Sequence, residues 1–343
     1  MSRDAASSRL PRILLVRTSA LGDIVHSLPV LAALRRRWPE AEIGWVVDEA
    51  FAPLLEGHEL LDRLIPVPLR RWRRGGAGRA REIAGFLAAL RRFRAGIALD
   101  LMGNHKGALL ARLSGAGRRL GLGRADRREP SSALWLSETV AAAGVHAVER
   151  ALAVAAPLGA DPGAVDFAPG ALACGRERVP PGDYLFLHPG AAWGNKRYPA
   201  ERWGRVAERL GAALGLPVRV GAGPGERGLA DRVVAASGGR AVVHDAPSIP
   251  DLVGAVRGAR LVLAGDTGAA HLARALDRPL VAVHGPTDPE RHGPWRARDA
   301  AIWFRLPCSF CHQRMDEAKP CLLRIEPEQI AERALAQLGA TAV

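Results

Sequence analysis

The sequence predicts an α/β protein of two domains, each a parallel sheet with helices wound on both faces. Three observations predict this class. Short apolar runs of strand length alternate with longer amphipathic segments, as in doubly wound sheets. A loose Gly- and Pro-rich stretch from Asp161 to Asp183 divides the alternation into two halves. The length of 343 residues gives each half enough chain for a core of its own.

The first half opens with a strand and a helix. Ile13–Val16 is a compact apolar run, and the amphipathic period from Asp23 to Arg37 predicts a helix that ends at Trp38-Pro39. The remaining elements follow from the same two patterns. They are strands over Ile43–Val47, Leu60–Val67 and Ala95–Leu101, and helices over Arg79–Arg92 and Lys106–Leu113.

The alternation restarts with a strand over Tyr184–His188. Further strands are predicted over Val218–Val220, Arg260–Ala264 and Leu280–His284, and helices over Ala200–Leu214, Gly228–Ala236, Ile249–Val256, Ala269–Leu276 and Glu326–Leu338. We therefore predict a first domain over 1–170 and a second over 171–325. The remaining segment, 326–343, is predicted as a C-terminal helix that packs back on the first domain.

Composition indicates an ordinary globular protein, with 48% hydrophobic and 24% charged residues. No run approaches the roughly 18 apolar residues of a membrane span. The polar stretch from Met1 to Leu10 has no apolar core of the kind that secretory signals carry. We therefore expect a cytosolic protein.

The positive charge is concentrated in one region. The net charge is +13, and residues 63–130 hold 17 Lys or Arg against 4 Asp or Glu, so the rest of the chain is neutral. Only three of the 48 cations are Lys, which is consistent with a coding bias toward Arg. Such a bias does not explain why the excess is local. The clustering therefore favours a site for an acidic partner.

The cysteines allow a weak metal hypothesis. Cys308, Cys311 and Cys321 form C-x2-C-x9-C beside His312, which could ligate zinc, but a second pair at zinc-finger spacing is missing. The alternative is a structural or incidental thiol cluster. Cytosolic thiols stay reduced, so a disulfide framework is not expected.

Two glycine-bearing turns, one in each half, carry the clearest functional signal. Gly22-Asp23 follows the first strand, and Gly265-Asp266-Thr267-Gly268 follows the run over 260–264. Each places backbone N–H groups and a carboxylate at a helix start, where phosphates and polar ligands bind. The pair indicates two half-sites that face each other across a cleft.

Asp23 has two interpretations that the sequence leaves open. An aspartate at a helix start is a common N-cap. It is equally a candidate general base, which needs only hydrogen-bond reach to a substrate hydroxyl in the complex. Spacing alone does not decide between them.

Lys196 and His271 are the cationic candidates of the second half. Lys196 lies in the loop after the strand Tyr184–His188, where it could neutralise a diphosphate leaving group, or be a solvated loop cation. His271 lies one turn into the helix that follows Asp266, and the dipole of that helix suits a pyrophosphate. Its ring either faces that site or packs within the helix.

Two further motifs have several interpretations. Gly223-Pro224-Gly225-Glu226-Arg227-Gly228 matches G-x-G-x-x-G, which would bind NAD or FAD, but it follows the second strand of its domain rather than the first. There are two alternatives to a cofactor site. The motif is a tight turn, or Glu226 accepts hydrogen bonds from ribose hydroxyls. The run Arg70-Arg71-Trp72-Arg73-Arg74 suits phosphate on nucleic acid, on a lipid or on a sugar.

With these motifs in view, the chain resembles glycosyltransferase family 9, the ADP-heptose:lipopolysaccharide heptosyltransferases, and most of all their heptosyltransferase I branch. The likeness runs from about Arg12 to Pro294. Its carriers are Thr18-Ser19-Ala20-Leu21-Gly22-Asp23-Ile24-Val25-His26-Ser27-Leu28-Pro29, Arg70-Arg71-Trp72-Arg73, Arg128-Glu129-Pro130, His146-Ala147-Val148-Glu149-Arg150, Lys196 before Tyr198-Pro199, Asp266-Thr267-Gly268-Ala269-Ala270-His271-Leu272 and Gly285-Pro286-Thr287-Asp288-Pro289.

The resemblance implies a GT-B fold of two Rossmann-like domains facing a central cleft, the first binding the acceptor and the second the nucleotide sugar. It implies inverting transfer of L-glycero-D-manno-heptose from ADP-heptose to a Kdo residue of the lipopolysaccharide inner core. By likeness, Asp23 is the base and Lys196 holds the diphosphate. Further residues are implied for the donor (Glu226, Asp266, Thr267, Gly268 and His271) and for the acceptor (Arg70, Arg71, Arg73, Arg128 and His146).

The resemblance also implies what the protein does not need. No D-x-D occurs in the sequence, which fits a family that requires neither a divalent metal nor another cofactor. We expect a monomer that binds no nucleic acid and meets the anionic inner leaflet of the inner membrane through its Arg-rich face. Two departures stand out: Ala191-Ala192 replaces a pair of threonines, and the Cys308, Cys311 and Cys321 tail is more typical of other members, including heptosyltransferase II. That branch, with a heptose acceptor, is the alternative function, followed by a basic nucleic-acid-binding protein or a Rossmann oxidoreductase.

Overall fold

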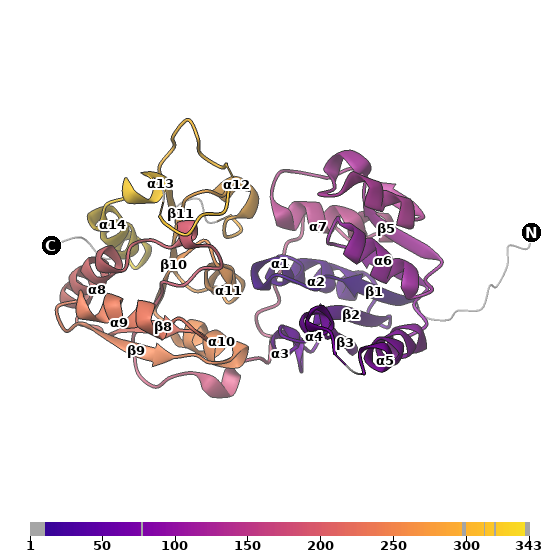
Figure 1. The fold of residues 1–343 in the computed structure, drawn as a ribbon, viewed down its shortest axis with the longest axis horizontal. Coiled ribbons are helices and arrows are strands. Elements are labelled where there is room, and N and C mark those ends of the chain that lie inside the picture. The colour runs from indigo at the N-terminus through magenta and orange to yellow at the C-terminus, as the bar shows by residue number, and fades with distance from the viewer. Residues whose placement is uncertain (1–10, 77, 297–299, 312, 319, 340–343) are drawn as a thin grey trace, which may run out of the picture. The chain divides into compact units, whose positions relative to one another are not determined.

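The computed structural model describes residues 11–76, 78–296, 300–311, 313–318 and 320–339. Within them the chain forms two compact α/β units, which divide between Leu172 and Ala173 (Figure 1). None of the described helices is long and apolar enough to cross a membrane.

The first unit is built on a six-stranded sheet of order β3-β2-β1-β4-β5-β6, in which all paired strands are parallel. Its strands are β1 (Arg12–Val16), β2 (Glu42–Asp48), β3 (Arg63–Val67), β4 (Ile97–Asp100), β5 (Arg118–Leu122) and β6 (Glu138–Val140). Its helices are α1 (Leu21–Val25), α2 (Leu28–Arg37), α3 (Ala52–Leu55), α4 (Leu69–Arg74), α5 (Arg79–Arg92), α6 (His105–Leu113) and α7 (Ala147–Ala155). The chain order reverses direction between β1 and β4, the switch point at which open α/β sheets bind ligands.

The second unit repeats this topology in a parallel sheet of order β12-β11-β10-β7-β8-β9. Its strands are β7 (Leu185–His188), β8 (Val218–Ala222), β9 (Ala241–Asp245), β10 (Leu261–Gly265), β11 (Leu280–His284) and β12 (Ala301–Trp303). Its helices are α8 (Ala200–Leu214), α9 (Arg227–Ala235), α10 (Ile249–Gly258), α11 (Gly268–Ala275), α12 (Pro289–His292), α13 (Pro320–Leu323) and α14 (Pro327–Gln337). Here the switch point lies between β7 and β10.

The central strand of the first unit is buried on both faces. Leu14 and Val16 of β1 join a core with residues of α5 and α6, including Phe86. Side chains alternate along a strand, so Ile13 and Leu15, which are also fully buried, point to the opposite face. There α2 and α7 pack together. A strand covered on both faces explains why the sequence shows an unbroken apolar run.

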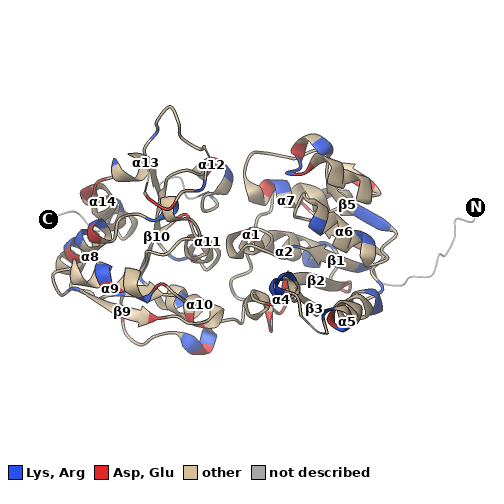
Figure 2. Cartoon of the chain, viewed as in Figure 1, with Lys and Arg blue, Asp and Glu red and all other residues tan. Residues whose placement is uncertain are grey.

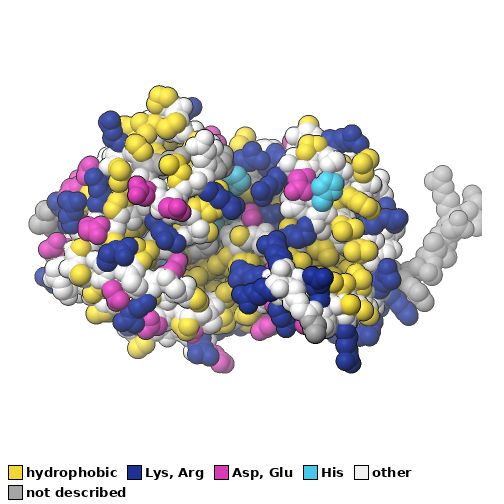
Figure 3. Space-filling model, in the orientation of Figure 1, with side chains coloured by type: hydrophobic (Ala, Val, Ile, Leu, Met, Phe, Trp, Pro, Cys, Tyr) yellow, Lys and Arg dark blue, Asp and Glu magenta, His cyan; other side chains and the backbone are white. Residues whose placement is uncertain are grey.

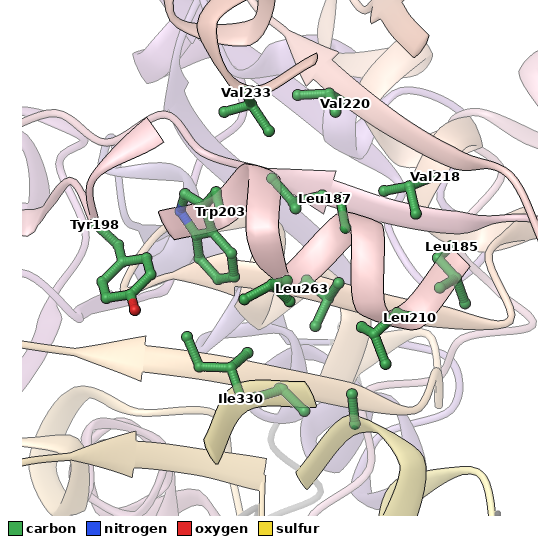
Figure 4. Packing of buried hydrophobic residues seen from close by; sticks show 14 of the residues in the cluster. Leu185, Leu187, Tyr198, Trp203, Leu210, Val218, Val220, Val233, Leu263 and Ile330 are labelled. Atoms are coloured by element: carbon green, nitrogen blue, oxygen red, sulfur yellow. The ribbon is translucent and has the colours of Figure 1, made fainter. Parts of the chain in front are cut away.

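The core of the second unit lies between its sheet and the helices α8, α9 and α14. Trp203 of α8 is fully buried and packs edge-on against Tyr198 at 5.1 Å, among leucines and valines of the strands (Figure 4). The hydroxyl of Tyr198 donates to the carbonyl of Ile325 at 2.7 Å. This bond ties the start of α8 to the segment that leads into α14.

The terminal helix differs from the prediction. Ile330 and Ala334 of α14 are fully buried in the core of the second unit, against Leu210 of α8, whereas the sequence analysis placed this helix on the first domain. Its amphipathic period shows that one face is covered but carries no information about which partner covers it.

The predicted helix over Asp23–Arg37 is two helices, α1 and α2, with His26 and Ser27 between them. Pro29 lies in the first turn of α2, where the missing N–H costs nothing, but a proline ring is not accommodated inside a continuous helix. The analysis did not predict α3, α4, β5, β6, α7, β9, α12, β12 and α13, and all of these except α7 are short.

A buried ion pair lies at the carboxyl edge of the first sheet. Asp100 ends β4, and its carboxylate binds the guanidinium of Arg127, with both side chains fully buried. Arg127 also donates to the hydroxyl of Ser132 at 2.8 Å and to the carbonyl of Leu122 at 3.1 Å. Burial raises the pKa of Asp100, against the opposing effect of Arg127. A lone buried charge would be costly, so each partner depends on the other.

We predict that Arg127→Met lowers the free energy of unfolding by about 3–5 kcal/mol, because it leaves the Asp100 carboxylate buried without its partner. Arg118→Met is the matched control. Its guanidinium pairs with Glu138 at 2.8 Å near the surface, so its loss should cost less than about 1 kcal/mol. Equilibrium urea unfolding of both variants measures the difference, and equal losses would contradict the argument.

Candidate functional site

Most of the candidate residues follow strands at the carboxyl edges of the two sheets. Asp23 comes after β1, and Lys106 after β4, the two strands at the switch point of the first sheet. Lys196 comes after β7 and Asp266 directly after β10, the equivalent pair in the second sheet. Each sheet therefore places polar groups where open α/β sheets bind ligands.

Asp23 is held by two donors and remains open to solvent. Oδ1 pairs with Nη2 of Arg17 at 2.8 Å, and Oδ2 accepts the N–H of Ala20 at 3.1 Å. The Asp23 side chain is 41% exposed, whereas that of Arg17 is 14% exposed. Asp23 lies inside α1 rather than at its N-cap, which is Ala20. The carboxylate is therefore oriented at a helix start and accessible to a hydroxyl.

Cations gather beside this carboxylate. Helix α4 consists of Leu69-Arg70-Arg71-Trp72-Arg73-Arg74 and has no buried residue. Its arginine positions are coloured in Figure 2, and Lys and Arg side chains lie close together on the surface of this part of the first unit in Figure 3. The pKa of Lys106 is lowered by partial burial, by Arg73 and by Arg17, while Asp48 opposes the shift. Lys106, Arg73 and Arg17 are thus within electrostatic reach of one another, an arrangement that a bound anion would stabilise.

The arginines of α4 differ in their partners. The guanidinium of Arg70 lies over the ring of Phe51 at 5.6 Å. Arg71 pairs with Glu49 at 3.3 Å and Glu82 at 3.5 Å, so acidic groups already offset part of its charge.

A pocket of about 170 Å³ lies beside these arginines, and its lining residues are Arg71, Trp72, Arg74, Gly75, Arg79 and Glu82. A larger pocket of about 370 Å³ is lined by Arg35, Pro39, Glu40, Ala41, Glu42, Asp62 and Arg63. Glu42 and Arg63 begin β2 and β3, so the larger pocket lies at the amino edge, away from the residues described above. The smaller pocket is the one that adjoins the candidate site.

Arg128 is exposed, but its neighbours in the chain are fixed. Arg127 is buried against Asp100, and a carboxylate oxygen of Glu129 accepts the N–H of His105 at 2.7 Å, at the start of α6. Arg128 therefore projects from a backbone anchored on both sides.

His146 serves as the N-cap of α7. Its Nδ1 accepts the N–H of Val148 at 3.1 Å, and its own N–H is bound by Glu149. The ring is buried and lies 5.1 Å from that of His26, three residues after Asp23. The structure thus gives His146 a capping role and places it next to the segment that carries Asp23.

In the second unit, side chains from two loops and from helix α11 converge on the carboxylate of Asp266. Lys196, from the loop after β7, places Nζ 2.6 Å from Oδ2. Thr287, from the loop after β11, donates its hydroxyl to the same oxygen. His271 of α11 brings Nε2 within 3.8 Å of Oδ1. Burial alone would raise the pKa of Asp266, but His271 and the charge of Lys196 hold it well below its usual range.

The start of α11 has the features of an anion site. Thr267 is its N-cap, yet the hydroxyl makes no capping bond, and Oγ1 is buried without a hydrogen-bond partner among the described residues. The first N–H groups of a helix have no partner within the helix. Gly268, the first residue of α11, keeps the backbone accessible there. These groups suit an anionic ligand such as a phosphate.

Glu226 lies against the loop that leads to Lys196. Its Oε2 accepts the N–H of Gly223 at 3.2 Å and lies 4.0 Å from Nε2 of His188. A Cβ on Gly190 would lie 2.1 Å from the Glu226 carboxylate, so only glycine allows this approach. Burial lowers the pKa of His188, against the opposing effect of Glu226.

The G-x-G-x-x-G match at Gly223–Gly228 forms a tight turn into α9, with Gly225 at φ +80°. It follows β8 rather than β7, the strand at the switch point. A Cβ on Gly228 would meet nothing within 4 Å, so close helix packing does not require this glycine. The turn interpretation, with Glu226 as a possible ligand group, fits this geometry best.

Among the residues that the structure describes, the cysteines near the C-terminus form no cluster that could hold a metal ion. Cys308 is exposed and Cys321 is buried, and burial raises the pKa of Cys321, with Cys308 and Cys311 adding to the shift. His312, the fourth ligand of the zinc hypothesis, lies outside the described residues.

Sequence reasoning missed Arg17, Lys106 and Thr287. One signal could have found Lys106: it is one of three lysines in an Arg-rich chain and follows the helix cap Asn104 directly after a strand. Arg17 is close to Asp23 in the sequence, but its residue type alone does not indicate that the two side chains pair. Thr287 lies in the Gly285–Pro289 motif quoted above, but its partner Asp266 follows another strand, so no role could be assigned to it.

Comparison with known proteins gives consistent matches. A model of the family described as glycosyltransferase family 9 (heptosyltransferase) matches residues 83–322. Lipopolysaccharide heptosyltransferase 1 of Pseudomonas aeruginosa is 33% identical, over 95% of this chain and 98% of that protein. The structure of the E. coli heptosyltransferase WaaC with ADP superposes with a TM-score of 0.81 at 29% identity, covering 95% and 99% of the two chains. WaaC with ADP-2-deoxy-2-fluoro heptose gives 0.77 at 28% identity, covering 94% and 98%.

The His284 imidazole, at the end of β11 beside Asp266, yields a pH prediction. It is fully buried, both ring nitrogens lack partners among the described residues, and burial lowers its pKa to about 4. The unfolded chain binds this proton near pH 6.5 and the folded protein only near 4. Stability should therefore fall as pH decreases through this window, by at most about 1.4 kcal/mol per unit for this group.

His284→Phe should reduce that slope in urea unfolding measured between pH 7 and 4. At pH 7 the variant should be no less stable than the parent, because it removes two unsatisfied polar atoms. An unchanged slope, or a large loss of stability at pH 7, would contradict this account of His284.

Proposed function

This chain belongs to glycosyltransferase family 9, and we propose that it transfers L-glycero-D-manno-heptose from ADP-heptose to a Kdo residue of the lipopolysaccharide inner core. It is a glycosyltransferase with a GT-B fold. The observation that carries the proposal is the convergence of Lys196, Thr287 and His271 on Asp266 at the start of α11. The names of its relatives support heptose as the transferred sugar.

The second unit is proposed as the donor-binding domain. The start of α11, with Thr267 and Gly268, offers N–H groups and a buried hydroxyl to the diphosphate. Lys196 has three donor positions, and its bond to Asp266 occupies one of them. The others can meet phosphate oxygens. Glu226 is assigned to the ribose, because a carboxylate can accept hydrogen bonds from the ribose hydroxyls.

The first unit is proposed as the acceptor-binding domain. Kdo carries a carboxylate, and lipid A carries phosphates, so the acceptor is strongly anionic. Arg70, Arg71, Arg73 and Arg128 are assigned to these groups, because guanidinium forks bind carboxylate and phosphate in pairs of hydrogen bonds. Lys106 joins this set on the strength of its electrostatic contact with Arg73. His146 is assigned a supporting role beside His26.

The reaction is proposed as a single displacement. Asp23 takes the proton of the acceptor hydroxyl as its oxygen attacks the anomeric carbon from the face opposite the diphosphate, which inverts that centre. The bond from the anomeric carbon to the phosphate oxygen breaks, and ADP leaves with the electron pair. Lys196 and the start of α11 stabilise the charge that develops on ADP. Arg17 orients the Asp23 carboxylate. No divalent metal enters these steps.

The place of action is proposed as the cytoplasmic face of the inner membrane, where a monomer meets its lipid-anchored acceptor. The exposed arginines of α4 and α5 support an electrostatic contact with anionic lipid. We predict that binding to vesicles containing phosphatidylglycerol weakens as salt is raised from 50 to about 300 mM, because screening shortens the reach of the charges. Salt-independent sedimentation would contradict it.

Two alternative functions can be distinguished from the proposed one by experiment. A heptosyltransferase II activity would require an acceptor that already carries heptose. A nucleic-acid-binding protein would use the same basic surface but would leave the Asp266 site without a role.

The decisive experiment measures ADP release from ADP-heptose by the purified protein, with Kdo-lipid A present or absent and with or without EDTA. We expect release that depends on the acceptor and is insensitive to EDTA. Release only with heptosylated cores would favour heptosyltransferase II, and loss of activity in EDTA would contradict metal independence.

Asp23→Asn should lower kcat by about 10²–10⁴-fold, because the amide cannot accept the hydroxyl proton. Its affinity for ADP, measured by calorimetry, should be unchanged. Turnover near the parent value would remove Asp23 as the base.

Lys196→Ala should lower kcat by about 100-fold, because a developing negative charge loses its cation in the transition state. The KM for the acceptor should change little. An effect confined to the acceptor KM would contradict the leaving-group role.

A further inference from the structure

The loop that carries Lys196 is held by a segment more than a hundred residues later in the chain. Asn195, immediately before Lys196, is fully buried. Its N–H donates to the carbonyl of Met315 at 2.9 Å, and its Nδ2 donates to the carbonyl of Gln313 at 2.6 Å. Two hydrogen bonds to alternate carbonyls of one segment without regular secondary structure fix both the backbone and the side chain of Asn195.

The two residues before Asn195 contact the same segment. A Cβ on Gly194 would lie 2.1 Å from the carbonyl oxygen of Asp316, so the two backbones meet at a distance that only glycine permits. The guanidinium of Arg314 lies over the indole of Trp193 at 4.7 Å. The ammonium of Lys196 lies over the same indole at 4.6 Å.

These contacts bear on Lys196 because a lysine side chain is flexible and loses rotamer entropy when it is fixed. Its ammonium has two anchors, the Asp266 carboxylate and the Trp193 ring. Asp266 is fixed at the end of β10. The position of the Trp193 ring depends in turn on Arg314 and on the backbone at Gly194.

We propose that residues 313–316 form a brace that positions Lys196 for the departing diphosphate, with Asn195, Trp193 and Arg314 as its positioning residues. This rests on the proposed function, which assigns the diphosphate to Lys196. The brace approaches from the segment after β12, whereas the other contacts of Lys196 come from β10 and its own loop. Arg314 acts through the indole on the orientation of the ammonium, and its own guanidinium needs no contact with substrate.

The test is a double-mutant cycle between Arg314→Ala and Lys196→Ala, with ADP affinity and kcat as readouts. Arg314 is exposed, so its variants should fold. With Lys196 present, Arg314→Ala should weaken ADP binding and lower kcat by about fivefold. In the Lys196→Ala background the same change should cost less than about twofold, because the residue it positions is gone. Arg314→Lys, which keeps a cation over the ring, should restore most of the loss.

Arg324→Ala is the matched control. Arg324 is also an exposed arginine over an aromatic ring, Phe304 at 5.6 Å, but it does not touch the Lys196 loop. It should leave ADP affinity and kcat unchanged and should match Arg314→Ala in melting temperature. A comparable effect of Arg324→Ala would show that general destabilisation, rather than positioning, explains the result.

Equal losses from Arg314→Ala in both backgrounds would overturn the brace, since Arg314 would then act independently of Lys196. An absence of any effect on ADP affinity and kcat would overturn it as well. Failure of the proposed function has a different signature: the parent protein would release no ADP in an acceptor-dependent way. The cycle on ADP affinity would still report whether Arg314 and Lys196 are coupled.

Discussion

The buried carboxylate of Asp266 is the interaction on which the second unit depends. Two loops and a helix, which follow three different strands, each bring one side chain to it: Lys196, Thr287 and His271 of α11. A buried carboxylate is costly without compensation, so the cation and the hydrogen bonds stabilise this edge of the second unit. The same contacts fix the positions of the two loops and the start of α11 relative to one another.

The first unit uses the same construction at its own carboxyl edge. The buried pair of Asp100 and Arg127 anchors the turn that bears Arg128, and Arg17 orients Asp23. Both arrangements follow from topology. Parallel strands end at one edge, so polar residues that follow separate strands are brought together there. Asp100 ends β4 and Arg127 follows β5, while Lys196 follows β7 and Asp266 follows β10.

The cations of the first unit are arranged differently. Arg73 and Arg17 lie close enough to Lys106 to lower its pKa together with partial burial, and Asp48 only partly offsets the shift. Holding like charges together costs free energy, which an anionic ligand recovers on binding. In the second unit, Lys196 pairs with the buried carboxylate of Asp266. The two halves thus combine an open cationic surface with a closed, charge-paired site, as suits an anionic acceptor and an ADP leaving group.

The sequence by itself determined the alternation of strands and helices, the two glycine-bearing turns and the local excess of arginine. Each is a local property. β1 and β10 are apolar runs because both of their faces are buried, and the turns that carry Asp23 and Asp266 follow these two strands. Tertiary structure alone decided which distant groups meet. The pairing of Lys196 with Asp266 spans 70 residues, that of Asn195 with Gln313 spans 118, and α14 packs on α8 rather than on the first unit. Periodicity shows that a face is buried or that a charge is present, but the partner is chosen by the packing of the whole domain, which no local pattern encodes.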